Sequence, residues 1–270
     1  GQHYDTPYFF SANVLQSAPL NVIQLQTIFR QHDDAFIEML NRIRRGDRNA
    51  EMLRSLNKRL NPNFVPENDD FIITLVPTNA AAKKLNDAAM ARLPDAPRLY
   101  RGDIDGEFER GRLPTDFNLE LKVGAQVMFV RNDPARRWVN GSIGTITQLE
   151  DEYVMVANAD GEELTVTRYT WENTRYSWNK QQKVVETETV GTFTQFPLQL
   201  AWAVTIHKSQ GLTFERVVVD LGRGAFAHGQ TYVALSRCRS LEGLILKTRV
   251  KARDILLDPN VVEFTQEWEH

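Results

Sequence analysis

The chain has 270 residues, 42% of them hydrophobic and 25% charged, and its formal net charge is −3. This composition is typical of globular proteins and excludes both disorder and general binding of polyanions. No apolar run is long enough to span a membrane, the N-terminus does not resemble a secretory signal, and the single cysteine, Cys238, excludes an internal disulfide or a cysteine metal site.

The first stretch, residues 1–113, alternates strands with amphipathic helices. Acidic residues open a helix at Asp33 and Asp34, and Gly46 suits its end. The expected elements are a strand at 22–28, this helix, a second helix at 51–60, a buried strand at 71–76 and a third helix at 80–93. Their alternation predicts parallel pairing and an α/β layer.

The second stretch, residues 114–195, has a different pattern of short strands separated by turns. Asn140-Gly141 is a turn signal of the kind found in hairpins. The expected strands lie at 121–130, 139–146, 153–156, 163–167 and 184–194. Several short strands at this spacing indicate a small barrel or sandwich, which we interpret as an insertion into the α/β domain.

The third stretch, residues 196–270, returns to the α/β pattern. The expected elements are a strand at 202–206, a buried strand at 217–221, a helix at 230–239 and a strand at 244–248. Two α/β pieces on either side of a β insertion are typical of one split domain.

Three runs carry groups that suit phosphate chemistry. Residues 205–214 place hydroxyl, amide, lysine and glycine groups in a strand-to-helix turn, where an anion finds N–H donors; a polar loop capping the strand is the alternative. Gln230 and Arg237 share one face of the predicted helix, and Arg237 is suited to stabilise a transferring phosphoryl group, although a surface salt bridge would also explain it. Arg30 ends a strand, where α/β sheets form ligand crevices.

Other chemistry has little support in the sequence. The five histidines show no metal-ligand spacing, so no metal site is predicted. Arg131, Arg136 and Arg137 form either a basic tip that touches DNA phosphates or a solvated turn. The aromatic residues of the second stretch either stack on bases or belong to the core of the barrel; they are Trp138, Trp171, Trp178 and Tyr176.

Together these runs resemble one family, the Pif-type and RecD-like branch of superfamily 1 DNA helicases. Residues 196–214 resemble the fifth helicase motif of that branch, 230–239 the sixth and 29–31 the fourth. Residues 121–146 are similar to its SH3-like insert. The resemblance implies an α/β fold, namely the second RecA-like domain (P-loop NTPase-type) of such a helicase with an inserted SH3-like β-barrel.

The resemblance also implies roles for single residues. Arg237 would be an arginine finger that reaches the γ-phosphate of ATP, and Arg30 would be a second contact to that phosphate. The residues that would couple nucleotide state to DNA are Gln210, Gly211 and Gln230. The residues that would lie along the single-stranded DNA backbone are Thr78, Asn79, Thr205, His207 and Lys208. Thr213 stands where many superfamily members have a ribose-binding glutamate, so we assign it no ribose contact.

The phosphate-binding loop G-x-x-x-x-G-K-[ST] is absent from the sequence, which contains no Gly-Lys pair. The resemblance thus implies the C-terminal motor part of an ATP-dependent DNA helicase that moves 5′ to 3′ on single-stranded DNA, unwinds duplex and serves DNA repair and recombination. ATP and Mg²⁺ would be held mainly by an N-terminal RecA-like domain of the same polypeptide. We therefore expect this chain alone to bind no cofactor and to be inactive. Its partners would be that domain and single-stranded DNA, inside the cell (cytoplasm or nucleoid if bacterial) and without a membrane.

Two other functions stay open on the sequence. The chain could be a non-enzymatic adaptor derived from a helicase, in which the barrel binds a protein or a nucleic acid. It could also belong to an RNA-directed or exonuclease-associated helicase of the same superfamily, which competition between DNA and RNA would reveal.

Overall fold

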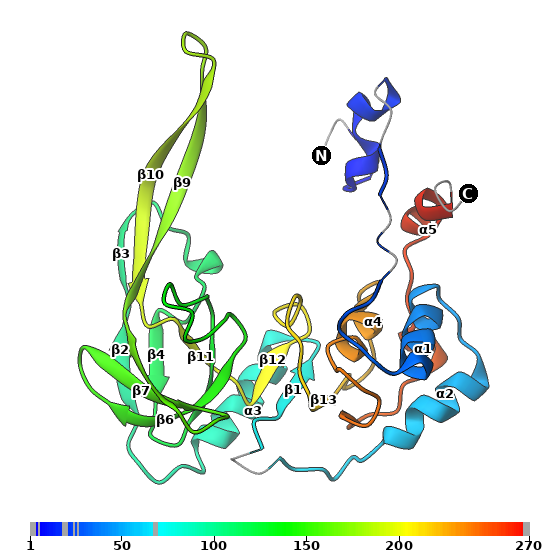
Figure 1. Ribbon diagram of the computed structural model, residues 1–270, viewed down its shortest axis with the longest axis horizontal. Coiled ribbons are helices and arrows are strands. Elements are labelled where there is room, and N and C mark those ends of the chain that lie inside the picture. The colour runs from blue at the N-terminus through cyan, green and yellow to red at the C-terminus, as the bar shows by residue number, and fades with distance from the viewer. Residues whose placement is uncertain are drawn as a thin grey trace.

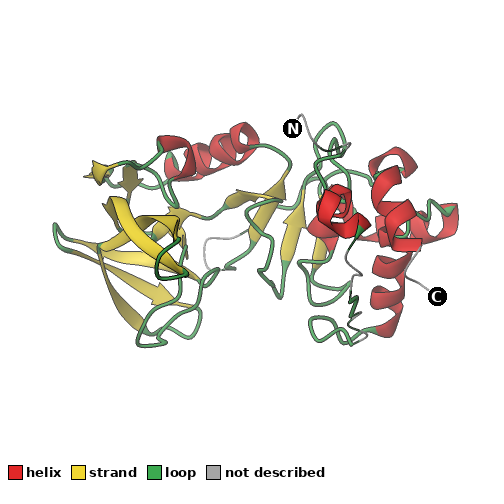
Figure 2. Cartoon of the chain, turned by 90° about the horizontal axis from the view of Figure 1, so that it is seen from above, coloured by secondary structure: helices red, strands yellow, loops and turns green. Residues whose placement is uncertain are grey.

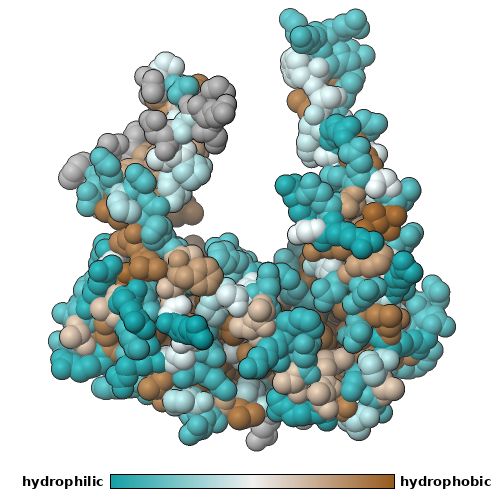
Figure 3. All heavy atoms as spheres, turned by 180° about the vertical axis from the view of Figure 1, so that it is seen from behind, coloured by the Kyte–Doolittle hydropathy of each residue, from teal (hydrophilic) through white to brown (hydrophobic). Residues whose placement is uncertain are grey.

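The computed structural model describes Tyr4 and residues 6–17, 21–23, 25, 27–66 and 70–266. Figure 1 shows a parallel lobe, built on a parallel sheet with helices, beside an antiparallel lobe that comprises residues 98–200. A long hairpin rises from the antiparallel lobe, and the space-filling view in Figure 3 shows it as an arm that stands clear of the body.

The parallel lobe is built on a four-stranded sheet in which every neighbouring pair runs parallel. Its strands, in spatial order, are β12 (Ala203–Thr205), β1 (Ile73–Val76), β13 (Val217–Val219) and β14 (Leu244–Leu246). All residues of these strands are buried, as expected of short apolar runs that are covered on both faces. The predicted parallel α/β layer is therefore confirmed.

Most helices gather at the end of the molecule away from the antiparallel strands (Figure 2). The α-helices are α1 (Asp34–Arg44), α2 (Ala50–Leu56), α3 (Asn79–Met90), α4 (Gln230–Leu235) and α5 (Pro259–Gln266). The 3₁₀ helices are η1 (Phe9–Ser11), η2 (Asn13–Gln16), η3 (Asn57–Arg59), η4 (Arg110–Arg112) and η5 (Ala252–Asp254). Helix α1 starts as predicted, because the Asp33 side chain accepts from the backbone N–H groups of Ala35 and Phe36.

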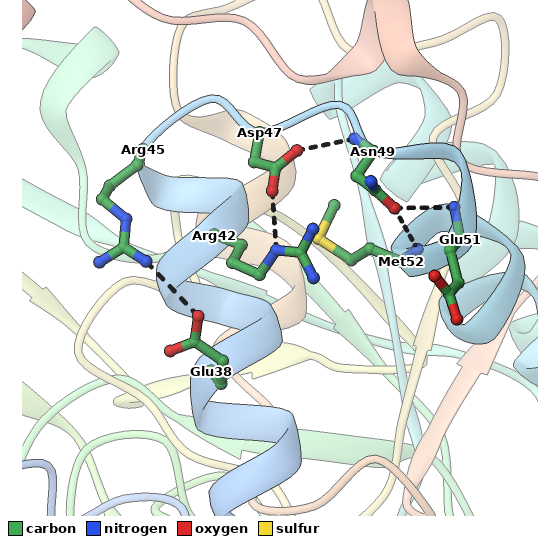
Figure 4. A network of polar contacts seen from close by, with 7 residues as sticks. All are labelled: Glu38, Arg42, Arg45, Asp47, Asn49, Glu51 and Met52. Carbon is green, nitrogen blue, oxygen red and sulfur yellow. Dashed lines mark hydrogen bonds and ion pairs between the residues drawn. The ribbon is translucent and has the colours of Figure 1, made fainter.

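Polar contacts hold the turn between α1 and α2 (Figure 4). Arg42 Nε donates to Asp47 Oδ2 at 2.7 Å, and Asp47 Oδ1 accepts from the backbone N–H of Asn49 at 2.8 Å. Asn49 in turn caps α2, because its Oδ1 accepts from the backbone N–H groups of Glu51 and Met52. The bond from Arg42 lowers the pKa of the Asp47 carboxyl, which favours the charged form that the turn needs.

The antiparallel lobe contains three sheets, with strand orders β11-β5-β6-β7-β8, β3-β10-β9 and β2-β4. Its strands are β2 (Arg98–Arg101), β3 (Asp103–Gly106), β4 (Asn118–Leu121), β5 (Gln126–Phe129), β6 (Ile143–Leu149), β7 (Tyr153–Asn158), β8 (Glu163–Thr167), β9 (Tyr169–Asn179), β10 (Val184–Gln195) and β11 (Leu198–Leu200). Inward-facing residues such as Leu121, Val127, Phe129 and Phe196 form a core separate from that of the parallel lobe.

Some predicted elements differ from the structure. Residues 22–28 form no strand in their described part, which leaves out Gln24 and Gln26, and Ile23 and Leu25 are 86% and 89% exposed. An apolar run becomes a strand only where a neighbouring strand satisfies its backbone groups, and no described strand pairs with this one.

Further differences concern several strands and one helix. The prediction of a single strand over 121–130 is wrong. The chain instead turns at Gly124, which has φ of 82°, between the two strands β4 and β5. The strands β2, β3, β9 and β11 were not predicted. The helix predicted over 230–239 ends at Leu235, so Gln230 and Arg237 do not share a helix face.

Candidate functional site

The first group of predicted site residues lies at one edge of the parallel sheet. Strands β1 and β12 are paired so that Val76 lies opposite Thr205, and both strands end at this edge. Thr78 caps helix α3 directly after β1, its Oγ1 accepting from the backbone N–H of Ala81 at 3.2 Å. The structure therefore brings together, from two distant parts of the chain, the predicted residues Thr78, Asn79, Thr205, His207 and Lys208.

The run after β12 is a series of turns rather than the predicted strand-to-helix turn. Its bonds are local: Ser209 N donates to Thr205 O at 3.1 Å, and Lys208 N donates to Thr205 Oγ1 at 3.3 Å. His207 and Lys208 are exposed, whereas Thr205 is 6% exposed. An exposed cation beside hydroxyl and amide groups is suited to bind the phosphates of a nucleic-acid strand.

The second group centres on Arg237, which follows helix α4 and is 7% exposed. Its Nε donates to Val233 O at 3.0 Å, its Nη1 to Leu212 O at 3.2 Å and its Nη2 to Ser236 Oγ at 2.9 Å. Burial, followed by the charge of Arg30, lowers the pKa of Arg237 to about 10. The guanidinium therefore stays positively charged at neutral pH.

Arg30 lies next to Arg237, although the two are far apart in the sequence. Arg30 Nε donates to Thr213 Oγ1 at 2.9 Å, and its Nη1 donates to Ser236 O at 3.4 Å. The neighbouring Gln31 fixes the same backbone, because its Nε2 donates to Ser236 O at 3.0 Å. Within the described part of the chain, neither arginine forms an ion pair with a carboxylate.

A hollow of about 600 Å³ opens beside Arg30, and Arg237 lies behind its wall, hydrogen-bonded to the lining residue Ser236. Its walls include Arg30, Thr213, Tyr232, Ser236 and Arg239. Two neighbouring guanidinium groups without a neutralising carboxylate repel each other, and a phosphate group removes that repulsion while accepting their hydrogen bonds. The arrangement is therefore suited to bind a phosphate.

The three predicted coupling residues do not line this hollow. Gln210 and Gly211 lie in the turns between Lys208 and Thr213, which connect the sheet edge to the arginines. Gln230 is 3% exposed, and its Oε1 accepts from the backbone N–H of Phe226 at 3.1 Å. Residues that the sequence did not single out also contribute, namely Gln31, Tyr232 and Ser236. All three stand within motif-like runs, Gln31 in 29–31 and the other two in 230–239.

Some aromatic and basic candidates of the antiparallel lobe are engaged within the lobe, and others are exposed on its hairpin. Trp138 is core, since it is 8% exposed and stacks on Phe129 at 4.5 Å between ring centroids. Tyr176 and Trp178 are 71% and 58% exposed on the hairpin β9–β10. Arg137 is bound to Asp133, with Nε 2.8 Å from Oδ2.

Neither a metal site nor a membrane-spanning helix occurs among the described residues. They contain no group of three or more His, Cys, Asp or Glu side chains that could hold a metal ion. None of the helices among them is long and apolar enough to cross a membrane.

The chain is similar to known DNA helicases. Residues 112–149 match the family described as "DNA helicase Pif1, 2B domain". The chain is 32% identical over 265 residues to the ATP-dependent DNA helicase Pif1 of Bdellovibrio bacteriovorus, a match that covers 96% of this chain and 57% of that relative.

Two similar solved structures come from Bacteroides. One is an unliganded Pif1, at 35% identity and a TM-score of 0.85, and the other is a Pif1 helicase in complex with ADP-AlF3 and ssDNA, at 34% identity and a TM-score of 0.74. Each match covers 99% of this chain, and this chain covers 62% and 61% of those proteins. The chain thus spans between 57% and 62% of the length of these relatives, and its mixed α/β sheets fit a RecA-like helicase domain.

Proposed function

This chain belongs to the Pif1 helicase family, and on that premise we propose that it is the C-terminal motor part of an ATP-dependent DNA helicase. In this role it translocates on single-stranded DNA and unwinds duplex. A second RecA-like domain of the same polypeptide supplies the phosphate loop that this sequence lacks. Its SH3-like insert is residues 114–195 of the antiparallel lobe, an assignment supported by the five-stranded sheet and the separate core of this lobe.

The observation that carries the proposal is the meeting of Arg237 and Arg30 without a carboxylate partner among the described residues. In the complete helicase they face ATP bound with Mg²⁺ at the cleft between the two RecA-like domains. Arg237 then acts as the arginine finger, and Arg30 is a second contact to the γ-phosphate. Both stabilise the negative charge of the transferring phosphoryl group, which is the main task of a protein in this reaction.

DNA binds at the edge where β1 and β12 end. Thr78, Asn79 and Thr205 contact the backbone there, together with His207 and Lys208. Gln210 and Gly211 couple the two sites, because they lie on the short path from Lys208 to Thr213, which contacts Arg30. Gln230 contributes to coupling from the start of α4, at the other end of the helix that precedes Arg237.

Replacing Lys208 with alanine is expected to weaken binding of single-stranded DNA by this chain. Each lost phosphate contact makes the negative slope of log affinity against log salt concentration shallower by about 0.7 for a single strand. Fluorescence anisotropy with a labelled oligonucleotide at several salt concentrations measures both quantities. Lys58→Ala is the matched control, because Lys58 is exposed beside Arg59, which contacts the start of β14 at the opposite sheet edge.

An equal effect of both lysine substitutions would contradict a specific DNA edge. The same assay with RNA competitors separates a DNA helicase from an RNA-directed one, because a protein that reads the 2′-OH prefers one sugar.

The purified chain alone is expected to hydrolyse no ATP, with or without single-stranded DNA. The reason is that no Gly-Lys pair exists from which a phosphate loop could be built, so the β- and γ-phosphates and Mg²⁺ have no cradle. A coupled assay of phosphate release measures this directly. Turnover that persists in the Arg237→Ala form of the chain would indicate a contaminant, whereas turnover abolished by that substitution would show that this chain hydrolyses ATP without the second domain and would contradict the prediction.

A further inference from the structure

We propose that the contact between Gly141 and Leu212 positions Arg237, so that the antiparallel lobe sets the rate of ATP hydrolysis. The proposal rests on the proposed function, in which Arg237 acts on ATP. Leu212 is the positioning residue, and Gly141 belongs to the β5–β6 turn of the antiparallel lobe.

The segment from Leu212 to Phe214 holds both Arg30 and Arg237. Leu212 O accepts from Arg237 Nη1 at 3.2 Å, and Thr213 Oγ1 accepts from Arg30 Nε at 2.9 Å. Phe214 N donates to Arg237 O at 2.9 Å, so the segment also holds the backbone of the finger. A displacement of this segment therefore moves both guanidinium groups together.

The β5–β6 turn is tied to itself by hydrogen bonds. Asp133 accepts from Arg137 through both carboxylate oxygens, at 2.8 Å from Nε and 2.9 Å from Nη2. These bonds lower the pKa of Asp133 to about 2, so the carboxylate stays charged. At the far end of the turn, Gly141 N donates to Phe129 O at 2.8 Å. A turn held at both ends transmits a movement of its strands instead of absorbing it.

Gly141 approaches Leu212 so closely that a larger residue does not fit without a shift. Its φ is 93°, and a Cβ at this position would overlap Leu212 Cδ2 and lie 3.2 Å from Cδ1. Leu212 is 9% exposed and belongs to the core of the parallel lobe, against which Ile143 of the antiparallel lobe also packs. Since packed interiors contain few voids, a movement of the turn displaces Leu212.

The geometry of phosphoryl transfer makes such a displacement effective. A misplacement of about 1 Å in a reacting group costs roughly 10²-fold in rate. Leu212 is joined to Arg237 by one direct hydrogen bond, so little of the movement is lost between the turn and the guanidinium. The affinity for ATP depends mainly on the phosphate loop of the other domain. The displacement therefore lowers the turnover rate and leaves ATP binding unchanged.

The test is Gly141→Ala in the complete helicase, compared with Gly161→Ala. Both glycines stand in turns of the antiparallel lobe at positive φ, 93° and 80°, but a Cβ at residue 161 meets nothing within 4 Å. The pair therefore separates the contact with Leu212 from the strain of an alanine at positive φ. We expect G141A to lower kcat for DNA-stimulated ATP hydrolysis by about 10–10²-fold, with KM for ATP and the affinity for ADP unchanged. G161A is expected to retain the parent kcat.

A double substitution tests the steric cause. Leu212→Ala removes the atoms that the new Cβ would overlap, so G141A/L212A is expected to lose less than the product of the two single losses. Equal kcat values for G141A and G161A would overturn the positioning role, and so would strictly multiplicative losses. Arg237→Ala, measured in parallel, keeps this failure distinct from a failure of the proposed function, because its large loss of turnover does not depend on Gly141.

Thermal unfolding of each variant shows whether it is folded. If G141A does not fold, Leu212→Val replaces it, because this change shortens the side chain at the contact while keeping the core apolar. A lowered kcat with an unchanged KM then supports the positioning role, and a kcat equal to that of the parent overturns it.

Discussion

Replacing Arg237 with alanine in the complete helicase is expected to lower ATP turnover by about 10³–10⁵-fold, the range known for arginine fingers. Arg237 is 7% exposed and the pKa of its guanidinium is lowered only to about 10, so the group is charged between pH 7 and 9. Its three hydrogen bonds, to Val233, Leu212 and Ser236, fix the orientation of the guanidinium, so little reorganisation is needed during the reaction. Steady-state ATP hydrolysis with saturating single-stranded DNA measures the loss.

Two further substitutions sharpen this result. Arg237→Lys keeps a charge but not the planar fork, so it is expected to recover only a small part of the loss. Arg216→Ala is the control, because Arg216 is an exposed arginine paired with Asp70, 3.3 Å away, and does not border the hollow. Unwinding that survives Arg237→Ala would contradict the helicase function and favour a non-enzymatic adaptor.

Replacing Arg30 with alanine is expected to lower ATP turnover by about 10²–10³-fold, the usual cost of one preorganised donor to the transition state. The effect is smaller than at Arg237 because Arg30 is less buried and thus acts in a more polar environment. Its guanidinium is held by Thr213 Oγ1 and Ser236 O at the rim of the hollow. Stopped-flow measurement of phosphate release distinguishes this step from product release.

Thr213→Val provides the matched control for Arg30. It removes the hydroxyl that orients Arg30 but leaves the charge, so its loss of turnover is expected to be smaller than that of Arg30→Ala. If Arg30→Ala instead weakened DNA binding and left turnover intact, Arg30 would belong to the DNA site rather than to the nucleotide site.

Much of the parallel lobe could be predicted from local patterns alone. Helix α1 starts at the capping residue Asp33, and β1 follows from an apolar run, because both features depend on neighbours a few residues away. The Asn140-Gly141 signal likewise predicted the β5–β6 turn, where Gly141 has φ of 93°. Both arginines stand within motif-like runs of the sequence, which is why residue order alone was enough to select them as candidates.

Other features depended on contacts between distant residues. The apolar run at 22–28 has the composition of a strand, but no described strand lies beside it to satisfy its backbone. Helix α4 ends at Leu235 because the backbone beyond it is bound elsewhere. Phe214 N donates to Arg237 O at 2.9 Å, and Arg239 N donates to Phe214 O at 3.0 Å. These long-range bonds use groups that a continued helix would have needed.

By itself the sequence determined the residue types, the order of the motifs and most elements of the parallel sheet, since these follow from short-range periodicity and capping. Only the tertiary structure decided that Arg30 and Arg237 lie beside each other, and that Gly141 approaches Leu212 of the segment that holds them. The physical reason is that both relations depend on contacts between residues that lie far apart along the chain, within the parallel lobe for the arginines and between the lobes for Gly141 and Leu212. Local propensity carries no information about such pairs.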